Sequence, residues 1–405
     1  MLTQFFGRLR DGHYHRLSTP LAIFLISRSL IWVIGFVARV AFSSRLGDGP
    51  WHTHPGQIYL DIWDRWDSAF YRGIARQGYV YLSPDEPGNV VFFPLYPLLT
   101  RLAHLLAADW TIAGLLVSHV CLLLALVVLY NLTLLEFGDR ATAQRAIFYI
   151  AIFPTAFFFS AVYSESTFLL FAVACVYFTR RREWLPAGVC GLLAATARVT
   201  GVLLYGYMLL EWASAGGLTW RNFYRRQGWA GVVTRPGLLA LLATQLVPLG
   251  LLLYMLFLQW RFGNALAFLQ GQADWGRGSL YSPLAILWRD FRPLLLDPFV
   301  PGWAVNDIWR TGLDALLGVG ALLLVPFVWR RLNAAYALYT AVAVLLPLAT
   351  GTTMSLSRYV LVLFPLFMLL AWWGRHPLVD RALTLAFALL LGILLTVFVN
   401  WGFVA

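Results

Sequence analysis

The stretch TIAGLLVSHVCLLLALVVLYNLTLL, residues 111–135, contains no Asp, Glu, Lys or Arg. A helix of this length and hydrophobicity is sufficient to cross the hydrocarbon core of a bilayer, which needs about 20 apolar residues. Further apolar runs lie on both sides of it, separated by charged residues or by Pro and Gly. The stretch therefore predicts a membrane-spanning helix in a chain that crosses the membrane many times.

The composition of the whole chain agrees with a membrane protein of several spans. Of its 405 residues, 60% are hydrophobic and 12% are charged, whereas soluble domains average about 25% charged residues. A soluble chain of this size could not bury so much apolar surface, which excludes a soluble enzyme and a disordered scaffold. The formal charge of +11 comes from Arg alone, since the chain contains no Lys. We attribute this charge to loops on one membrane face and expect no nucleic-acid partner.

The apolar runs predict an all-α polytopic membrane protein with about eleven spans in a single domain, residues 1–405. The spans lie near residues 20–43, 111–135, 143–160, 164–179, 184–198, 200–213, 236–261, 310–329, 334–350, 357–374 and 379–400. Because Arg-rich loops lie in the cytoplasm, the alternation of loops places the N-terminus there as well. The predicted cytoplasmic loops are 136–145, 180–183, 214–235, 330–333 and 375–378.

Two long polar segments, 44–110 and 262–309, then lie on the outer face and hold most of the acidic residues. We expect both to carry interfacial helices. Within the first segment, residues 92–108 are apolar but are interrupted by two prolines and by Arg101. We interpret them as an interfacial or re-entrant helix, because counting them as a span would place the later Arg clusters outside.

The first outer segment contains DIWDRWDSAFYRGIARQGY, residues 61–79. At helical spacing Asp64, Asp67 and Tyr71 share one face, which indicates an amphipathic helix at the membrane surface. One interpretation is structural, with the acids paired to arginines of the same segment. The alternative is that the carboxylates provide a general base or a metal site.

Three further charged residues are candidates for a site on the outer face. Glu165 lies between two apolar runs, where a carboxylate usually faces a cavity or a charged partner; the alternative is a helix N-terminus capped by Ser164. Arg198 and Arg358 lie at the outer ends of predicted spans. They either extend to lipid headgroups or grip a phosphate together. Arg28, inside the first span, requires an internal partner.

The second outer segment contains Gln272 and Trp275, which suit a sugar through amide hydrogen bonds and ring stacking, or a plain interfacial loop. No metal site is predicted, because the His and Cys residues show no metal-ligand spacing; the acids could nevertheless hold a divalent ion. The absence of a Gly-rich phosphate loop argues against a nucleotide sugar or ATP.

Several segments together resemble the Pig-V family, the second mannosyltransferases of glycosylphosphatidylinositol assembly, and its bacterial relatives. The matching pieces occur in family order: RWDS (65–68), IARQGY (74–79), FFPLYP (92–97), SAVYSE (160–165), ARVTG (197–201) and RY (358–359). One departure is Phe70, where many relatives have a His three residues after the motif Asp.

The resemblance implies a GT-C fold and the transfer of a hexose, mannose, from a polyprenyl-phosphate donor to a hydroxyl of a lipid-linked or glycan acceptor, with inversion. On this basis we hypothesise a single displacement in which Asp67 is the general base, Arg198, Arg358 or both hold the leaving phosphate, and Glu165 helps to position the acceptor or a metal. We expect the inner membrane of a prokaryote, with the active site on the extracytoplasmic face. The other predicted substrate-binding residues are Trp66, Tyr163, Gln272 and Trp275.

Two other classes of function share part of this pattern. A transporter or flippase of a lipid-linked substrate would also carry charges within the membrane. The chain shows no repeated half, however, and its acids gather in an outer segment. A membrane scaffold without catalysis would not need the Trp-Asp and Tyr-Ser-Glu motifs together.

Overall fold

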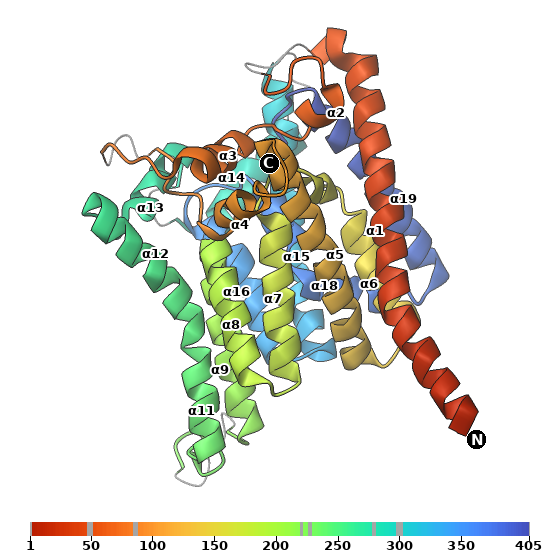
Figure 1. The fold of residues 1–405 in the computed structure, drawn as a ribbon, viewed down its shortest axis with the longest axis vertical. Helices are drawn as coiled ribbons and strands as arrows, with labels where there is room; N and C mark the ends of the chain where they lie inside the picture. The colour runs from red at the N-terminus through yellow and green to blue at the C-terminus, as the bar shows by residue number, and fades with distance from the viewer. Residues whose placement is uncertain are drawn as a thin grey trace.

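The computed structural model describes residues 2–46, 52–83, 88–218, 222–225, 229–277, 281–296 and 303–404, which fold into helices joined by turns (Figure 1). The elements are α1 (Leu2–Leu46), α2 (Ile58–Asp61), α3 (Ser68–Gln77), α4 (Leu95–Ala103), α5 (Trp110–Phe137), α6 (Arg140–Ala151), η1 (Ala156–Ser160), α7 (Glu165–Arg180), α8 (Trp184–Ala197), η2 (Val199–Leu203), α9 (Leu204–Ala215), α11 (Arg235–Thr244), α12 (Leu246–Phe262), α13 (Ala267–Gln270), η3 (Gly271–Trp275), α14 (Pro283–Leu296), α15 (Trp303–Arg331), α16 (Ala334–Ala349), α17 (Leu356–Leu361), α18 (Phe364–Trp373) and α19 (Pro377–Val399).

The structure confirms the prediction of an all-helical protein with several membrane spans. Among the described residues, five helical stretches are long and apolar enough to cross a membrane: Arg16–Phe42, Trp110–Phe137, Arg235–Phe262, Arg310–Arg331 and Pro377–Val399. The other predicted spans coincide with shorter helices, and the spans 143–160 and 357–374 are each divided between two helical segments. The 12 residues of α6 extend about 18 Å, against a hydrocarbon core of about 30 Å. The number of eleven spans therefore stays a prediction.

The predicted span 143–160 is not a continuous helix. Helix α6 ends at Ala151, and the short 3-10 helix η1 follows it. Pro154 lies in the break, where a proline removes a helical donor and clashes with the preceding turn. Arg28 of α1, which is buried, donates hydrogen bonds to the carbonyl oxygens of Ala151 at 2.6 Å and Ala156 at 3.0 Å. These carbonyls are the internal partners that Arg28 requires.

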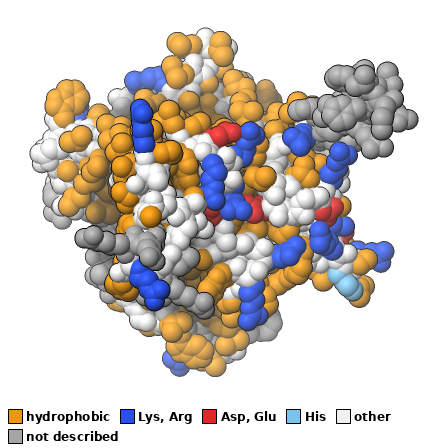
Figure 2. Space-filling view, turned by 90° about the horizontal axis from the view of Figure 1, so that it is seen from below, with side chains coloured by type: hydrophobic (Ala, Val, Ile, Leu, Met, Phe, Trp, Pro, Cys, Tyr) orange, Lys and Arg blue, Asp and Glu red, His pale blue; other side chains and the backbone are white. Residues whose placement is uncertain are grey.

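The loops predicted to be cytoplasmic meet at one end of the bundle, which we call the arginine-rich end. Arg180 of α7 donates from Nε to Glu136 of α5 at 2.6 Å and from Nη1 to Glu211 of α9 at 3.0 Å. Asn333, between α15 and α16, also donates to Glu211, at 2.7 Å. Basic side chains are spread over this face, which Figure 2 views from below. These contacts show that the ends of α5, α7, α9 and α15 lie together. This is expected if their loops lie on the same side of the membrane.

The opposite end, which we call the site end, carries the short helices α2, α3, α4, α13 and α14 (Figure 1, top). The prediction of one helix through residues 61–79 is wrong, because α2 ends at Asp61 and α3 begins only at Ser68. Between them Trp66 has a φ of 51° and breaks the helical path. Helix α4 has 9 residues and is about 14 Å long, which agrees with an interfacial segment that does not cross the membrane.

Replacing Arg180 by Met should destabilise the folded protein by about 3–5 kcal/mol, because the carboxylates of Glu136 and Glu211 would stay buried without the cation that neutralises them. The two acids are 8% and 4% exposed. Thermal unfolding in a fixed detergent measures the effect. The matched control is Arg181→Gln, which breaks an exposed pair with Glu183 and should cost less than about 1 kcal/mol. Equal stability of the two variants would contradict the assignment.

Candidate functional site

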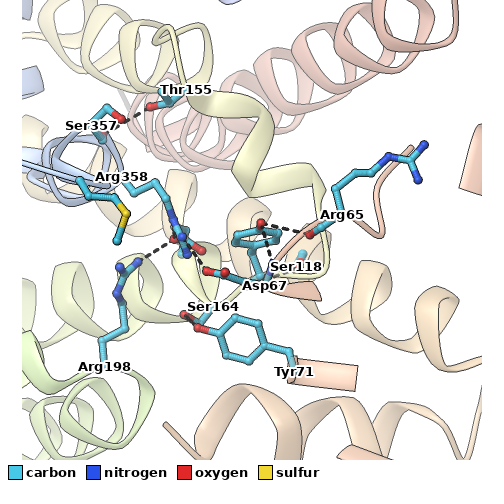
Figure 3. A network of polar contacts seen from close by, with 12 residues as sticks. Arg65, Asp67, Tyr71, Ser118, Thr155, Ser164, Arg198, Ser357 and Arg358 are labelled. Carbon is cyan, nitrogen blue, oxygen red and sulfur yellow. Dashed lines mark hydrogen bonds and ion pairs between the residues drawn. The ribbon is translucent and has the colours of Figure 1, made fainter. Parts of the chain in front are cut away.

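Asp67 lies in the tight turn that leads into α3 (Figure 3). The Tyr163 hydroxyl donates a hydrogen bond to the carbonyl oxygen of Arg65 at 3.1 Å and accepts one from the backbone N–H of Asp67 at 3.2 Å. Tyr163 is 1% exposed and therefore cannot exchange these bonds freely for bonds to water. It holds the backbone on both sides of Trp66 and so orients the Asp67 side chain.

The turn before Asp67 contains a strained residue. A φ of 51° places Trp66 in the left-handed region, which costs a bulky L-residue roughly 1–2 kcal/mol. The Trp66 ring packs edge-on against Trp401 and Phe403, with ring centroids 5.7 and 5.2 Å away. The Arg65 guanidinium lies 4.3 Å from the centroid of the Trp401 ring. The segment that follows α19 thus supports the turn in its strained form.

Four of the predicted charged residues form one network in the protein interior. Arg358 donates from Nη1 to Asp67 Oδ2 at 2.6 Å and from Nε to Glu165 Oε1 at 2.8 Å. Arg198 donates from Nη1 to the same Glu165 oxygen at 2.8 Å. Figure 3 shows Arg358 between the other groups. The network joins the turn before α3, the start of α7, the end of α8 and α17.

Two buried aromatic rings pack against the Arg358 guanidinium. Its central carbon lies 4.7 Å from the centroid of the Tyr163 ring and 5.1 Å from that of Phe158. Cation–π attraction at such distances adds to the ion pairs when the group is desolvated. Both rings are buried. The aromatic walls therefore help to keep the Arg358 head group at one position.

A second set of contacts holds α17, the helix that carries Arg358. The Asp314 carboxylate accepts the N–H of Ser357 at 2.8 Å. The Asp290 carboxylate accepts the hydroxyl of Thr353 at 2.7 Å. Between these anchors Ser355 has a φ of 64°, so the chain turns sharply into α17. Two acids from α14 and α15 thus fix the start of this short helix.

A polar cavity of about 110 Å³ lies beside the network at the site end. Its charged lining consists of Asp67, Arg198, Arg277 and Arg358. Uncharged polar groups of the lining include the side chains of Tyr71, Thr200, Gln272 and Tyr359. With one acid and three basic groups, the side chains that line the cavity carry a net positive charge, which favours an anionic ligand.

Arg277 is the functional candidate that sequence reasoning missed. Arg198 and Arg277 both contact the Tyr359 ring, with guanidinium carbons 5.2 and 5.5 Å from its centroid. Arg277 follows Gln272 in the second outer segment, and its side chain is buried. The only signal in the sequence is its place directly after a segment considered for sugar binding. Tyr359 belongs to the RY piece (358–359) of the resemblance, but the sequence pattern assigns it no role.

The structure gives three outcomes for the other predicted substrate-binding residues. Gln272 borders the cavity, whereas the side chain of Trp275 lies outside the described residues. Glu165, Trp66 and Tyr163 are not among the residues that line the cavity. They instead contact the residues that do.

Asp61 and Asp64, the other two acids of the stretch 61–79, have partners close in sequence. Arg65 donates to Asp61 at 2.7 Å, and Arg72 lies 3.3 Å from Asp64. Burial raises the pKa of the Asp64 carboxyl above its ordinary value, against the charge of Arg72. The structural interpretation therefore fits Asp61 and Asp64, while Asp67 differs because its partner is distant in sequence. In the part of the chain that the structure describes, no three His, Cys, Asp or Glu side chains form a group suited to a metal.

The predicted resemblance to the Pig-V family is confirmed for part of the chain. Residues 56–225 match the family model described as Mannosyltransferase (PIG-V). The GPI alpha-1,6-mannosyltransferase 2 of Mus musculus is 30% identical over 158 residues, which cover 36% of this chain and 30% of that protein. The GPI mannosyltransferase 2 of Chaetomium globosum is 31% identical over 131 residues, covering 27% of this chain and 28% of that protein. The chain thus matches less than a third of the length of these relatives.

Two solved structures also align with most of the chain. The oligosaccharyltransferase of Archaeoglobus fulgidus, tethered to an acceptor peptide, is 15% identical and aligns with a TM-score of 0.49 over 96% of this chain and 56% of that one. ArnT from Cupriavidus metallidurans, bound to undecaprenyl phosphate, is 16% identical and aligns with a TM-score of 0.40 over 92% and 77%.

Asp314→Ala should increase hydrogen exchange in residues 355–361, because the start of α17 loses an acceptor. Loss of one hydrogen bond worth about 1–1.5 kcal/mol raises local opening roughly five- to tenfold. Asp314→Asn keeps an acceptor oxygen and should exchange nearly as the parent protein does. Mass spectrometry of the peptides covering α17 measures the difference. Unchanged exchange in the alanine variant would show that Asp314 does not hold this helix.

Proposed function

We propose that the protein is a membrane mannosyltransferase that moves mannose from a polyprenyl-phosphate donor to an acceptor hydroxyl, with Asp67 as the general base. The observation that carries this proposal is one cavity bordered by the Asp67 carboxylate and three guanidinium groups. Transfer from a sugar phosphate needs a proton acceptor beside groups that hold a leaving anion. The cavity places both kinds of group on its walls.

The proposed step is a single displacement at the anomeric carbon. The acceptor oxygen forms a bond to this carbon while the bond from the carbon to the phosphate oxygen breaks. The proton of the acceptor hydroxyl passes to Asp67, and polyprenyl phosphate leaves with the bonding electron pair. Attack on the face opposite the leaving group inverts the configuration of the sugar.

Arg358 and Arg198 have donors to spare for the leaving phosphate. A guanidinium carries five N–H groups. Arg358 uses Nε and Nη1 for Glu165 and Asp67, and the contact of Arg198 with Glu165 uses Nη1. The remaining N–H groups suit the oxygens of a phosphate, which guanidinium binds in a bidentate manner. In this arrangement Glu165 acts as a positioning residue for both arginines, since it does not border the cavity.

A second cavity fits the lipid part of the donor. It has a volume of about 620 Å³ and lies between α3, α4, α8 and α12, with mostly apolar walls that include Leu192, Leu253 and Phe257. Thr196 borders this cavity, and Ala197 borders the polar one. Adjacent residues of α8 thus face both spaces. An isoprenoid chain in the apolar cavity would present its phosphate beside the arginines.

The match to the mannosyltransferase family supports mannose as the sugar, and it includes Asp67, Glu165 and Arg198. The predicted orientation of the Arg-rich loops supports an active site on the extracytoplasmic face of a prokaryotic inner membrane. The acceptor is a hydroxyl of a lipid-linked molecule or glycan. No step requires a metal ion.

Asp67→Asn should lower the rate of sugar transfer about 10²–10⁴-fold, because the amide cannot take the proton of the acceptor hydroxyl. The assay incubates the purified protein with polyprenyl-phosphate-mannose and candidate acceptors, and it measures released polyprenyl phosphate. Donor binding should persist, since the three arginines of the cavity remain.

Asp64→Asn is the matched control. Asp64 lies in the same turn and accepts a hydrogen bond from Thr111, which an amide oxygen can also accept, and it does not border the cavity. Its variant should keep transfer within about tenfold of the parent rate. Full transfer by Asp67→Asn overturns the assignment of the base. Movement of intact donor across the membrane without cleavage would instead indicate a flippase.

A further inference from the structure

A cavity at the arginine-rich end lies far from the site that the proposed function uses. Its volume is about 360 Å³, and three helices line it: α1, α5 and α7. The lining residues are Arg16, Asn131, Leu134, Leu135, Tyr177 and Arg181. Helix α1 packs against α5 and α6, and its N-terminal part points away from the bundle (Figure 1). We call the resulting space the α1 wedge.

Two guanidinium groups from different helices line the wedge. Arg16 comes from α1 and Arg181 from the end of α7, and both side chains are exposed. Arg181 donates to the Tyr177 hydroxyl at 2.9 Å, with its central carbon 5.5 Å from the centroid of the same ring. Its other amino group lies 2.9 Å from Glu183. Tyr177 and Glu183 thus restrict the Arg181 head group while leaving part of its donors open.

The charged residues of the wedge lining are Arg16 and Arg181, and Glu183 is an acid beside Arg181. The positive balance favours an anion at the mouth of the wedge.

Part of the wedge lining is apolar. Leu134 and Leu135 line the wedge on α5, and Leu135 is 50% exposed. On α1, Leu17 and Leu21 lie outside the cavity lining but follow Arg16 along the helix, and they are 62% and 44% exposed. A charged mouth above exposed leucines matches a molecule with a phosphate head and hydrocarbon tails. A free phosphate ion would use only the arginines.

We propose that the α1 wedge binds an anionic phospholipid, with its phosphate between Arg16 and Arg181 and its acyl chains along α1 and α5. Guanidinium groups bind phosphate oxygens in a bidentate manner. Basic pockets between membrane helices are suited to anionic head groups, and each basic residue near the surface adds to the attraction. The bound lipid fills the space between α1 and α7 and ties the N-terminal part of α1 to the bundle.

The test compares lipid retention by matched variants. The intact protein is reconstituted in phosphatidylcholine nanodiscs that contain phosphatidylglycerol, extracted with mild detergent and analysed by native mass spectrometry. The double variant Arg16→Gln/Arg181→Gln should bind phosphatidylglycerol at least about tenfold more weakly than the parent protein does. The control Arg235→Gln/Arg330→Gln removes the same charge from exposed positions of the same end and should retain phosphatidylglycerol as the parent protein does.

Three results would overturn the proposal. Equal loss in both double variants would mean that the lipid responds only to overall charge. Unchanged retention in Arg16→Gln/Arg181→Gln would mean that the wedge does not hold it. Displacement of the lipid by millimolar inorganic phosphate would identify a site for a free anion. Arg16→Lys/Arg181→Lys keeps the charge and should restore part of the retention, which separates loss of binding from loss of folding.

Discussion

Arg358, Asp67 and Glu165 meet in the protein interior, where none of their charges could remain alone. Removing an ion from water costs several kcal/mol unless a partner and hydrogen bonds compensate for it. Each of the three has such a partner, at 2.6 or 2.8 Å. It follows that three segments must lie next to one another: the turn before α3, the start of α7 and helix α17. The hydrogen bonds of Tyr163 and Asp314 then hold the turn before α3 and the start of α17 in place.

The same pairing gives the cavity its chemical character. Glu165 is fully buried and contacts two arginines, so it holds them at the wall without itself facing a ligand. Asp67 shares Arg358 with Glu165 but borders the cavity. One carboxylate thus organises the cations while the other stays accessible. This division arises from burial, since both groups are acids paired with arginine.

Much of the architecture could be predicted because its causes are local. Long apolar runs require helices in a membrane. Arg180 lies close to the loops around Glu136 and Asn333, which the sequence predicts to be on the same side of the membrane. A charge in an apolar setting is costly, which is why Glu165, Arg198 and Arg358 were identifiable. The break at Trp66 could not be identified from the sequence. Helical spacing depends only on residues close in sequence, whereas Trp401 and Phe403, far along the chain, support the strained turn. Arg277 was missed for the same reason.

The separation of Asp67 and Arg358 by 291 residues has a consequence for biosynthesis. Helices of a membrane protein enter the bilayer in the order in which the ribosome makes them. The carboxylates of Asp67 and Glu165 are therefore present long before α17 brings the guanidinium that neutralises them. Until that helix arrives, the nascent chain holds two acids without Arg358, and Trp66 lacks the aromatic rings beyond α19. The order of translation and the order of charge compensation are different, so the site end is the part of the protein that must mature last.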